Sequence, residues 1–309
     1  MNSTRTLTHW KLRTRTLELC RRTLVMGVVN ITPDSFSDGG NFLDADAAIA
    51  HGLRLLDEGA DLLDLGAEST RPGTHAAIAN QASVSAEEEQ ARLLPVIEGI
   101  LRARPEVVIS ADTYKSSTAR AALRAGAEII NDVSGFTWDE GMPSVCAEAG
   151  CGVVLMHTRG RPDEWHAQSK FPAHALIESV RDGLEISVAA AHRSGIAPET
   201  IVLDPGYGFG KKFDENYVLL ARQAELLALG MPLMAGLSRK SFLGHTLAEM
   251  YAGAQAPVQA RETASIAAMV TAILNGASIV RVHNVKPAVE AARIADAVLD
   301  AQAHVQSEG

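Results

Sequence analysis

The sequence has few of the residues that build disulfide frameworks or redox and zinc centres. Its 309 residues include 3 cysteines, Cys20, Cys146 and Cys151. This odd, low count excludes a disulfide scaffold and favours a reducing compartment. Cys146 and Cys151 do not form a Cys-x-x-Cys pair, so a redox or zinc site is not expected. Since free cysteines usually behave as small hydrophobic residues, we expect these thiols to be buried and structural.

Long apolar runs and an excess of positive charge are also missing. No uninterrupted apolar run reaches the roughly 18 residues of a membrane-spanning helix, so we expect no membrane segment. The chain carries 28 Lys and Arg residues against 37 Asp and Glu residues, a net charge of -9. This balance argues against a nucleic-acid-binding surface but allows a local anion pocket. With 47% hydrophobic and 21% charged residues, the composition is that of a globular protein.

The N-terminal 23 residues form a basic stretch with two possible interpretations. Six basic residues and one acid are typical of an organelle transit peptide. However, residues 9–12 and 15–19 partly alternate polar and apolar side chains, which predicts a short strand pair. The stretch also has no apolar signal core. We therefore predict residues 1–23 to be an extension with a small β-hairpin, on a cytoplasmic protein.

The rest of the chain repeats one order of elements: a helical pattern, a turn that contains glycine, and an apolar run. Glycine just past a helix supplies the left-handed position that ends it. Apolar runs without alternation are typical of parallel strands, which are buried on both faces. The predicted strands are 24–30, 61–66, 106–112, 128–132, 152–157, 200–204, 232–237 and 278–283. The predicted helices are 45–58, 86–103, 116–125, 142–149, 173–194, 215–229, 258–275 and 286–301.

Eight strand–helix units within this length favour a (β/α)8 TIM barrel over a doubly wound sheet. No linker or low-complexity tract divides the chain. We therefore predict an α/β protein with a single barrel domain over residues 24–303 and a flexible tail at 304–309.

Each predicted strand has polar side chains at or just after its C-terminal end. These are Asn30, Glu68, Asp112, Asn131, His157, Asp204, Ser238 to Ser241, Arg281 and His283. The C-terminal strand ends of a TIM barrel converge on one mouth, where the active site lies. The pattern therefore predicts a single polar site rather than scattered solvated ends.

Three apparent motifs fail on inspection. Residues 206–212 resemble a phosphate-binding loop but lack its Gly-x-x-x-x-Gly-Lys-Ser/Thr spacing, and we interpret them as a flexible turn. Residues 236–238 are not a nucleophile elbow, because Lys240 stands where glycine is needed. The 10 histidines show no metal-binding spacing.

Two long polar loops, 30–40 and 66–73, stand out from the plain connections. Loops of this length inside compact domains are more often binding loops than simple links. The polar stretch after the second loop continues to Ser85.

These segments resemble dihydropteroate synthase, and the resemblance covers residues 24 to about 300. It includes both loops and the motifs 112–115, 129–135, 203–210, 238–242 and 281–283. Asn284 stands where the family often has aspartate, and Thr158-Arg159 where methionine is common after the histidine. Neither departure touches the core motifs.

The resemblance implies condensation of 6-hydroxymethyl-7,8-dihydropterin pyrophosphate with p-aminobenzoate, which yields 7,8-dihydropteroate and pyrophosphate. It implies pterin contacts by Asp112, Asn131, Asp204 and Lys240. Acceptor side chains suit the amino and ring N–H donors of a pterin, and a site built for such pairing rejects other ligands. For Asp112 taken alone, a helix N-cap before Ser116 is an equally good interpretation.

The resemblance also implies a pyrophosphate pocket, formed by Asn30, Thr70, Arg71, Arg281 and His283. Arg281 and His283 are two residues apart on one strand, so their side chains point the same way. Arginine offers bidentate contacts to phosphate. The resemblance further implies Mg²⁺ as cofactor, with Asn30 as its ligand.

A p-aminobenzoate slot between Phe36, Pro72 and Ser241 is also implied. The residues expected to carry catalysis are Arg281, His283, Lys240 and Arg71.

The family's dimers use the last helices, which implies a homodimer here. Two alternatives share the barrel and the pterin acceptors: a pterin-binding methyltransferase domain that acts on methyltetrahydrofolate, and a non-catalytic pterin-binding relative. The methyltransferase needs no pyrophosphate pocket, so Thr70-Arg71 and the turn at 238–241 argue against it.

Overall fold

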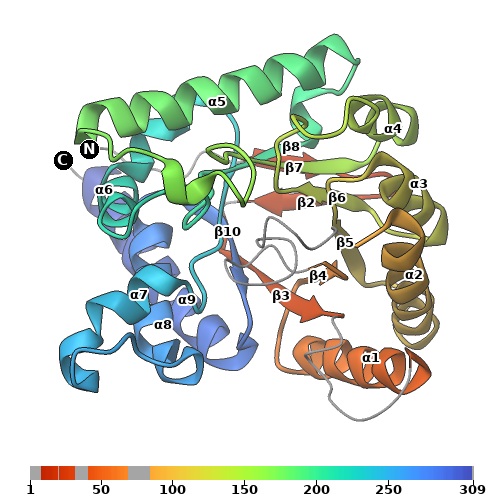
Figure 1. Ribbon diagram of the computed structural model, residues 1–309, viewed down its shortest axis with the longest axis horizontal. Coiled ribbons are helices and arrows are strands. Elements are labelled where there is room, and N and C mark those ends of the chain that lie inside the picture. Colours follow the sequence, from red (N-terminus) through yellow and green to blue (C-terminus); the bar gives the residue numbers. More distant parts are fainter. Residues whose placement is uncertain (1–7, 20, 32–40, 69–83, 308–309) are drawn as a thin grey trace.

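Eight parallel strands close into a barrel in the computed structural model, which describes residues 8–19, 21–31, 41–68 and 84–307 (Figure 1). The barrel strands are β3 (Leu24–Asn30), β4 (Leu62–Gly66), β5 (Val108–Asp112), β6 (Ile129–Asp132), β7 (Gly152–Met156), β8 (Ile201–Asp204), β9 (Leu233–Ala235) and β10 (Ala277–Val282). They pair in chain order, and β10 closes the ring against β3. The predicted TIM barrel is confirmed, and the doubly wound alternative is excluded.

Helices follow the strands on the outside of the barrel (Figure 1). They are α1 (Asn41–Asp57), α2 (Ala86–Ala103), α3 (Ser116–Ala125), α4 (Met142–Ala149), α5 (Ala173–Arg193), α6 (Glu215–Arg222), α7 (Ser241–Thr246), α8 (Glu262–Leu274) and α9 (Val285–Ser307). None of the helices described is long and apolar enough to cross a membrane.

Several boundaries differ from those predicted. The pattern over 215–229 is α-helical only to Arg222 and continues as the 3₁₀ helix η5 (Gln223–Leu229). Another 3₁₀ turn, η7 (Val258–Arg261), precedes α8. The short elements η3 (Trp165–Ala167), η4 (Pro198–Thr200), η6 (Ala248–Tyr251) and α7 were not predicted. The last helix runs to Ser307, into the segment predicted as a tail.

The predicted N-terminal hairpin is also present, as the antiparallel pair β1 (Thr8–Lys11) and β2 (Thr16–Leu19). It contributes Trp10, Leu12 and Leu19 to a cluster with apolar side chains from all eight barrel strands, such as Met26 and Ile279. The indole N–H of Trp10 donates to the Thr200 carbonyl oxygen at 2.8 Å. The hairpin therefore seals the end of the barrel where the strands begin, which leaves the opposite end for a site.

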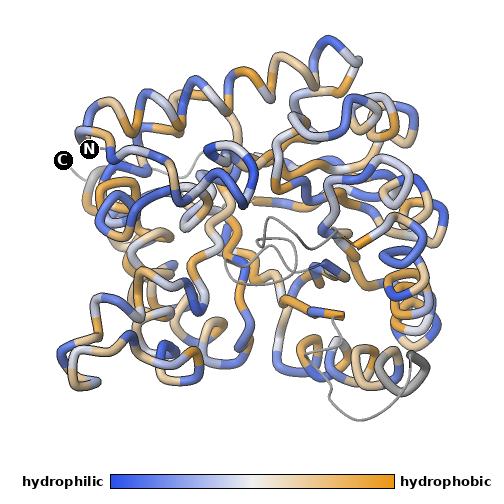
Figure 2. Tube along the Cα trace, in the orientation of Figure 1, coloured by the Kyte–Doolittle hydropathy of each residue, from blue (hydrophilic) through white to orange (hydrophobic). Residues whose placement is uncertain are grey.

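A larger apolar cluster fills the space between the strands and the helices. The strands appear mostly hydrophobic in Figure 2, as expected for strands buried on both faces. Cys146 and Cys151 are free and buried here, as predicted, while Cys20 lies outside the described residues. Several of the buried polar side chains inside this apolar frame, including Asn131, His157 and Asp204, lie at or just after the C-terminal strand ends.

Candidate active site

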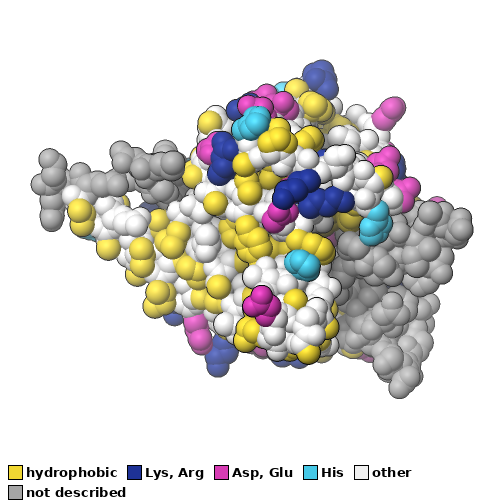
Figure 3. All heavy atoms as spheres, turned by 60° about the vertical axis from the view of Figure 1, so that its left-hand side comes forward, with side chains coloured by type: hydrophobic (Ala, Val, Ile, Leu, Met, Phe, Trp, Pro, Cys, Tyr) yellow, Lys and Arg dark blue, Asp and Glu magenta, His cyan; other side chains and the backbone are white. Residues whose placement is uncertain are grey.

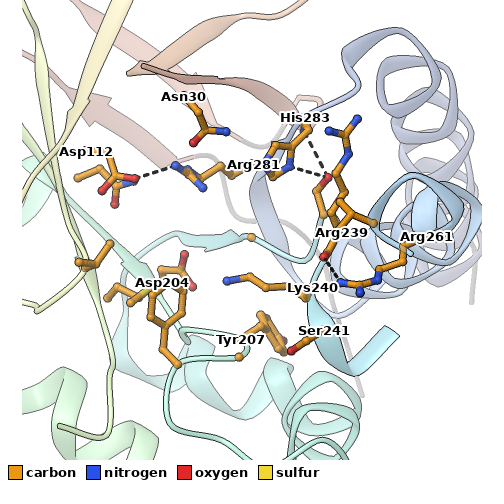
Figure 4. A pocket seen from close by; sticks show the side chains of 18 of the residues that line it. Asn30, Asp112, Asp204, Tyr207, Arg239, Lys240, Ser241, Arg261, Arg281 and His283 are labelled. Atoms are coloured by element: carbon orange, nitrogen blue, oxygen red, sulfur yellow. Dashed lines mark hydrogen bonds and ion pairs between the residues drawn. The ribbon is translucent and has the colours of Figure 1, made fainter. Parts of the chain in front are cut away.

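A pocket of about 330 Å³ lies at the mouth of the barrel (Figure 4). Its lining brings together eight of the twelve residues that the resemblance assigns to the site, which come from six strand ends and the loops after them. These eight are Asn30, Asp112, Asn131, Asp204, Lys240, Ser241, Arg281 and His283. The remaining four, Phe36, Thr70, Arg71 and Pro72, lie outside the described residues.

Arg281 bridges two carboxylates at the bottom of this pocket. Its Nε donates to Asp64 Oδ2 at 2.6 Å, and its Nη2 donates to Asp112 Oδ2 at 2.8 Å. Burial alone lowers the pKa of Arg281, but the two carboxylates outweigh that effect and raise it above the ordinary value. The guanidinium is therefore a positive charge held between Asp64 and Asp112, whereas His283 contacts Ser238.

The Asp112 carboxyl has a pKa close to neutral pH. Burial first and the nearby charge of Asp64 second raise its pKa to about 7, against the opposing charge of Arg281. Two carboxylates thus share one guanidinium, an arrangement that keeps a proton on the pair at higher pH than usual. The N-cap interpretation of Asp112 is wrong, because Asp139 Oδ2 accepts the Ser116 amide hydrogen at 2.7 Å instead.

Asp64 is a central residue of the site that the sequence analysis missed. It is fully buried in β4, where Oδ1 accepts from Ser110 Oγ at 2.6 Å and Oδ2 from Asn131 Nδ2 at 3.1 Å. Together with its bond to Arg281, these contacts fix Asn131 and Arg281 relative to each other. Asp64 escaped notice because it lies inside an apolar run. A charged residue within a strand predicted to be buried was the available signal, since such charges are rarely unpaired.

Asp204 ends β8 and lies on the opposite side of the pocket. Its side chain is buried, and Oδ1 accepts from the Gly206 amide at 2.7 Å. Burial raises the pKa of Asp204, although the Gly206 amide and the positive charges of Lys240, Lys211 and Arg281 act against it. Figure 4 shows the Lys240 side chain extending toward Asp204. The Lys240 ammonium lies over the Phe209 ring, 4.0 Å from its centroid.

The turn that carries Lys240 is held in an unusual backbone conformation. Arg239 has a φ of 60°, a region that non-glycine residues rarely adopt. Its amide donates to Ser265 Oγ at 2.9 Å, and its carbonyl oxygen accepts from Arg261 Nη1 at 3.0 Å. Ser238 Oγ in turn lies 3.0 Å from His283 Nδ1 (Figure 4). The α8 region thus fixes the turn, and strain at such turns is typical of functional sites.

A second charged cluster supports the start of the second polar loop. Lys115 forms ion pairs with Glu68 and with Glu89, the latter at 3.1 Å, and Tyr114 Oη donates to Glu68 Oε1 at 3.2 Å. Glu68 also lines the pocket. This arrangement accounts for the motif 112–115, whose later residues position Glu68 rather than facing the pterin side.

The residues that depart from the family pattern lie beside the pocket. Arg159 is buried and pairs with Glu215 at 3.5 Å, and its Nη2 donates to the Ser169 carbonyl oxygen at 2.8 Å. Thr158 Oγ1 donates to the Gly160 carbonyl oxygen at 3.0 Å. These contacts shape the segment that carries Trp165 to the pocket wall. Asn284 borders a neighbouring cavity.

Comparisons with known proteins agree with this geometry. Residues 26–283 match the family of pterin binding enzymes. The chain is 41% identical to dihydropteroate synthase of Escherichia coli K12 over 92% of this chain and 94% of that one. It is 42% identical to the Mycobacterium leprae enzyme of the same name, over 91% and 95%.

Solved structures extend the likeness to three dimensions. The Yersinia pestis dihydropteroate synthase in complex with a sulfonamide drug has a TM-score of 0.83 at 39% identity, covering 95% of this chain and 100% of that one. The Xanthomonas albilineans enzyme with 4-aminobenzoic acid has a TM-score of 0.82 at 39% identity, covering 95% and 98%. This chain therefore belongs to the family of pterin binding enzymes and, within it, to the dihydropteroate synthases.

Proposed function

We propose that the pocket condenses 6-hydroxymethyl-7,8-dihydropterin pyrophosphate with p-aminobenzoate through the residues assigned below. The observation that carries this proposal is the pairing of buried acceptors with fixed cations in one pocket. Asp112, Asn131 and Asp204 supply acceptors for the donor edge of a pterin, while Lys240 and Arg281 supply positive charge. A flat ring with several N–H donors and an anionic tail matches this division.

The pterin ring lies between the two carboxylate sides of the pocket in this proposal. Asp204 accepts from the 2-amino group and the ring N3–H, and its buried position makes an unpaired donor there costly. Asn131 and Asp112 accept along the remaining edge. Lys240 donates to the carbonyl side of the ring. Such a set of contacts discriminates strongly against rings that lack these donors.

The pyrophosphate lies toward Asn30, Arg281 and His283, with Thr70 and Arg71 completing the pocket from outside the described residues. Asn30 is half-buried at the end of β3 and lines the same pocket as His283. One amide oxygen fits Mg²⁺, which usually keeps several waters and takes further oxygens from a substrate phosphate. When bound beside Asn30, Mg²⁺ would neutralise part of the negative charge of the pyrophosphate.

The p-aminobenzoate slot lies at the rim of the pocket, beside Ser241. Ser241 is exposed at the pocket rim, where its hydroxyl and backbone amide hold the carboxylate. Phe36 and Pro72 form the other walls and lie outside the described residues. Phe209 and Lys240 line the same pocket, and in this proposal the aniline nitrogen reaches the pterin methylene from the Ser241 side.

The reaction proceeds by cleavage of the C–O bond at the pterin methylene and attack by the aniline nitrogen. The electron-rich dihydropterin stabilises positive charge at that carbon, and the amine is neutral at pH 7, so no strong base is needed. Arg281, His283 and Arg71 stabilise the leaving pyrophosphate, and Lys240 positions the ring. Removing one such anion donor costs on the order of 3–4 kcal/mol in the barrier.

A cytoplasmic homodimer is the assembly we propose. Exposed apolar side chains on the last two helices support it, including Leu274 on α8 and Ile294 and Val298 on α9. Figure 3 shows hydrophobic side chains gathered on the face turned forward from the left of Figure 1. Sedimentation of the protein and of an Ile294→Glu variant tests the dimer, which we expect the variant to weaken.

One assay separates the proposed reaction from its alternatives. The purified protein is incubated with the pterin pyrophosphate, labelled p-aminobenzoate and Mg²⁺, and dihydropteroate is resolved by chromatography. The proposed function predicts a product that forms with all three components. Methyl transfer from methyltetrahydrofolate to a corrinoid, without dihydropteroate, would establish the methyltransferase alternative. Tight pterin binding without either product would indicate a non-catalytic relative.

A further inference from the structure

Lys211 is a buried lysine one layer below the pocket. The residue is 7% exposed, and it follows the glycine-rich turn after β8. Its Nζ lies 2.8 Å from the Gly206 carbonyl oxygen, 3.1 Å from that of His157 and 3.3 Å from that of Phe209. A fourth contact, at 2.9 Å, reaches His157 Nδ1. The turn at 206–212, which we interpreted from the sequence as flexible, is therefore held in place by hydrogen bonds to this amine.

The four contacts indicate that Lys211 is an ammonium ion. Carbonyl oxygens only accept hydrogen bonds, and a neutral amine would turn its lone pair toward one of them. Burial lowers the pKa of His157 well below its ordinary value, with Lys211 and Arg159 adding to that effect, so the imidazole is neutral and its Nδ1 accepts. Burial likewise lowers the pKa of Lys211 well below its ordinary value, while the charge of Asp204 acts against that effect. The three carbonyl oxygens and the imidazole nitrogen around Nζ favour the charged form of this amine.

The buried ammonium of Lys211 has no carboxylate in direct contact among the described residues. No ion pair of Lys211 within 4.0 Å occurs in the described part of the chain. A buried lysine in a purely structural position is costly, because the ammonium loses its hydration. A methionine would fill the same space without that cost. The charge itself therefore calls for a function.

Asp204 lies directly above this arrangement. Its carbonyl oxygen accepts from the His157 amide at 2.9 Å, and its Oδ1 accepts from the Gly206 amide. Both His157 and Gly206 thus contact Asp204 on one side and Lys211 on the other. The packing is tight, since a Cβ at Gly206 would lie 1.9 Å from the His157 carbonyl oxygen and 3.1 Å from Lys211 Nζ.

We propose that Lys211 is a positioning residue for the pterin site, whose ammonium fixes the 205–211 turn and supplies a positive charge beneath the Asp204 carboxylate. The charge favours the ionised carboxylate, the form that accepts two hydrogen bonds from the pterin. The inference rests on the proposed contact between Asp204 and the pterin.

Other charged groups around the pair act in both directions. Lys240 and Arg281 face Asp204 from β9's following turn and from β10, and both favour its carboxylate. Lys240 and Arg159 oppose the charge of Lys211, whereas Asp204 and Glu215 favour it. Lys240 is half-buried and lines the pocket, whereas Lys211 is buried and does not line it. The buried ammonium can therefore keep its contacts when the pocket fills.

The experiment compares Lys211→Met with Lys212→Met, a neighbouring lysine whose Nζ contacts the His166 carbonyl oxygen at the surface. Calorimetry measures the affinity for 6-hydroxymethylpterin at pH 6, 7 and 8. Two buffers of different ionisation enthalpy give the number of protons released on binding. We expect Lys211→Met to bind at least about tenfold more weakly at pH 7, since each unit by which the Asp204 pKa rises costs a factor of about ten below that pKa.

Proton release distinguishes an electrostatic role from a purely structural one. In Lys211→Met, more Asp204 is protonated, so pterin binding releases more protons at pH 7 than in the wild type, and the deficit in affinity shrinks toward pH 8. Lys211→Gln keeps two N–H donors and removes the charge, and it is expected to show the same release if the methionine variant does not fold. Lys212→Met should match the wild type.

Two results would overturn the inference. One is an affinity and proton release in Lys211→Met equal to those of Lys212→Met. The other is an equal loss of affinity at every pH without extra proton release. The Asp204→Asn variant separates the two levels of the proposal: unchanged pterin affinity there removes the Asp204 contact itself, whereas a loss there without any effect of Lys211 removes only the inference about Lys211.

Discussion

Replacement of Asp64 by asparagine tests the floor of the pocket. Asp64 accepts three hydrogen bonds, from Ser110, Asn131 and Arg281. An asparagine offers one acceptor oxygen and one amide group of almost the same shape. With its oxygen toward Asn131 and Arg281, the amide can donate to the Ser110 hydroxyl, which then accepts instead of donating, so the main loss is the negative charge that pairs with Arg281. The substitution therefore changes charge and hydrogen bonding with little change in volume.

The structure allows an estimate of the cost. Breaking a buried ion pair destabilises a protein by about 3–5 kcal/mol, because the remaining charge is left uncompensated. Asp112 remains as a partner of Arg281, so we expect a value near the lower end, about 3 kcal/mol. At about 2.1 cal/mol/K of unfolding entropy per residue, a chain of 309 residues loses roughly 1.5 °C of Tm per kcal/mol. The expected decrease in Tm is then about 4–5 °C.

Thermal unfolding and pterin calorimetry together measure this effect. Pterin affinity should fall along with Tm, since Asn131 and Arg281 lose the residue that fixes them. Asp57→Asn is the matched control, because Asp57 pairs with Arg104 at the surface and such pairs contribute about 0–1 kcal/mol. An Asp64→Asn protein with the Tm and pterin affinity of Asp57→Asn would refute the assigned role of Asp64.

Three further substitutions or conditions probe the assigned contacts. Asp204→Asn places a donor against the pterin donors and should weaken 6-hydroxymethylpterin binding by roughly 2–4 kcal/mol in calorimetry; unchanged affinity would contradict the contact. Arg281→Ala should reduce binding and turnover of the pyrophosphate ester much more than binding of the plain pterin, and equal losses would place Arg281 on the ring. The raised pKa of Asp112, about 7, predicts pterin affinity that falls as the pH drops from 8 to 6, because the accepting carboxylate becomes protonated. Asp112→Asn should flatten that pH profile. A flat profile in the wild type would show that ionised Asp112 is not required.

The barrel was predictable from the sequence because its signals are local and repeated. Glycine marks the ends of helices, as at Gly126 and Gly150, where φ is 113° and 61°. The strands are apolar because both faces are buried, and their polar ends converge on one mouth. Asp112, Asn131 and Asp204 could therefore be placed together without coordinates.

Contacts that depend on spatial partners were not predictable. Asp64 looked like part of a core strand, and Lys211 looked like part of a flexible turn. Their importance comes from partners far away in the chain: Asp64 meets Arg281 across 217 positions, and Lys211 meets His157 across 54. Sequence spacing predicted that Arg281 and His283 share one side of a strand, whereas β10 ends at Val282 and His283 follows it. It could not show that carboxylates already hold the Arg281 guanidinium.

The position of Arg281 suggests how the two halves of the site communicate. In the structure, Nη2 of Arg281 donates a hydrogen bond to the carboxylate of Asp112, an acceptor that we assign to the pterin. A pterin that donates to Asp112 competes with this contact and leaves Nη2 available for the pyrophosphate, while Nε stays on Asp64. Pterin binding should therefore strengthen binding of pyrophosphate with Mg²⁺, by a factor within the usual coupling range of about 5–150. Titration of pyrophosphate with and without 6-hydroxymethylpterin measures this factor, and Arg281→Lys, which lacks the second donor arm, should reduce it. Equal pyrophosphate affinity with and without the pterin would mean that Arg281 serves the two ligands independently.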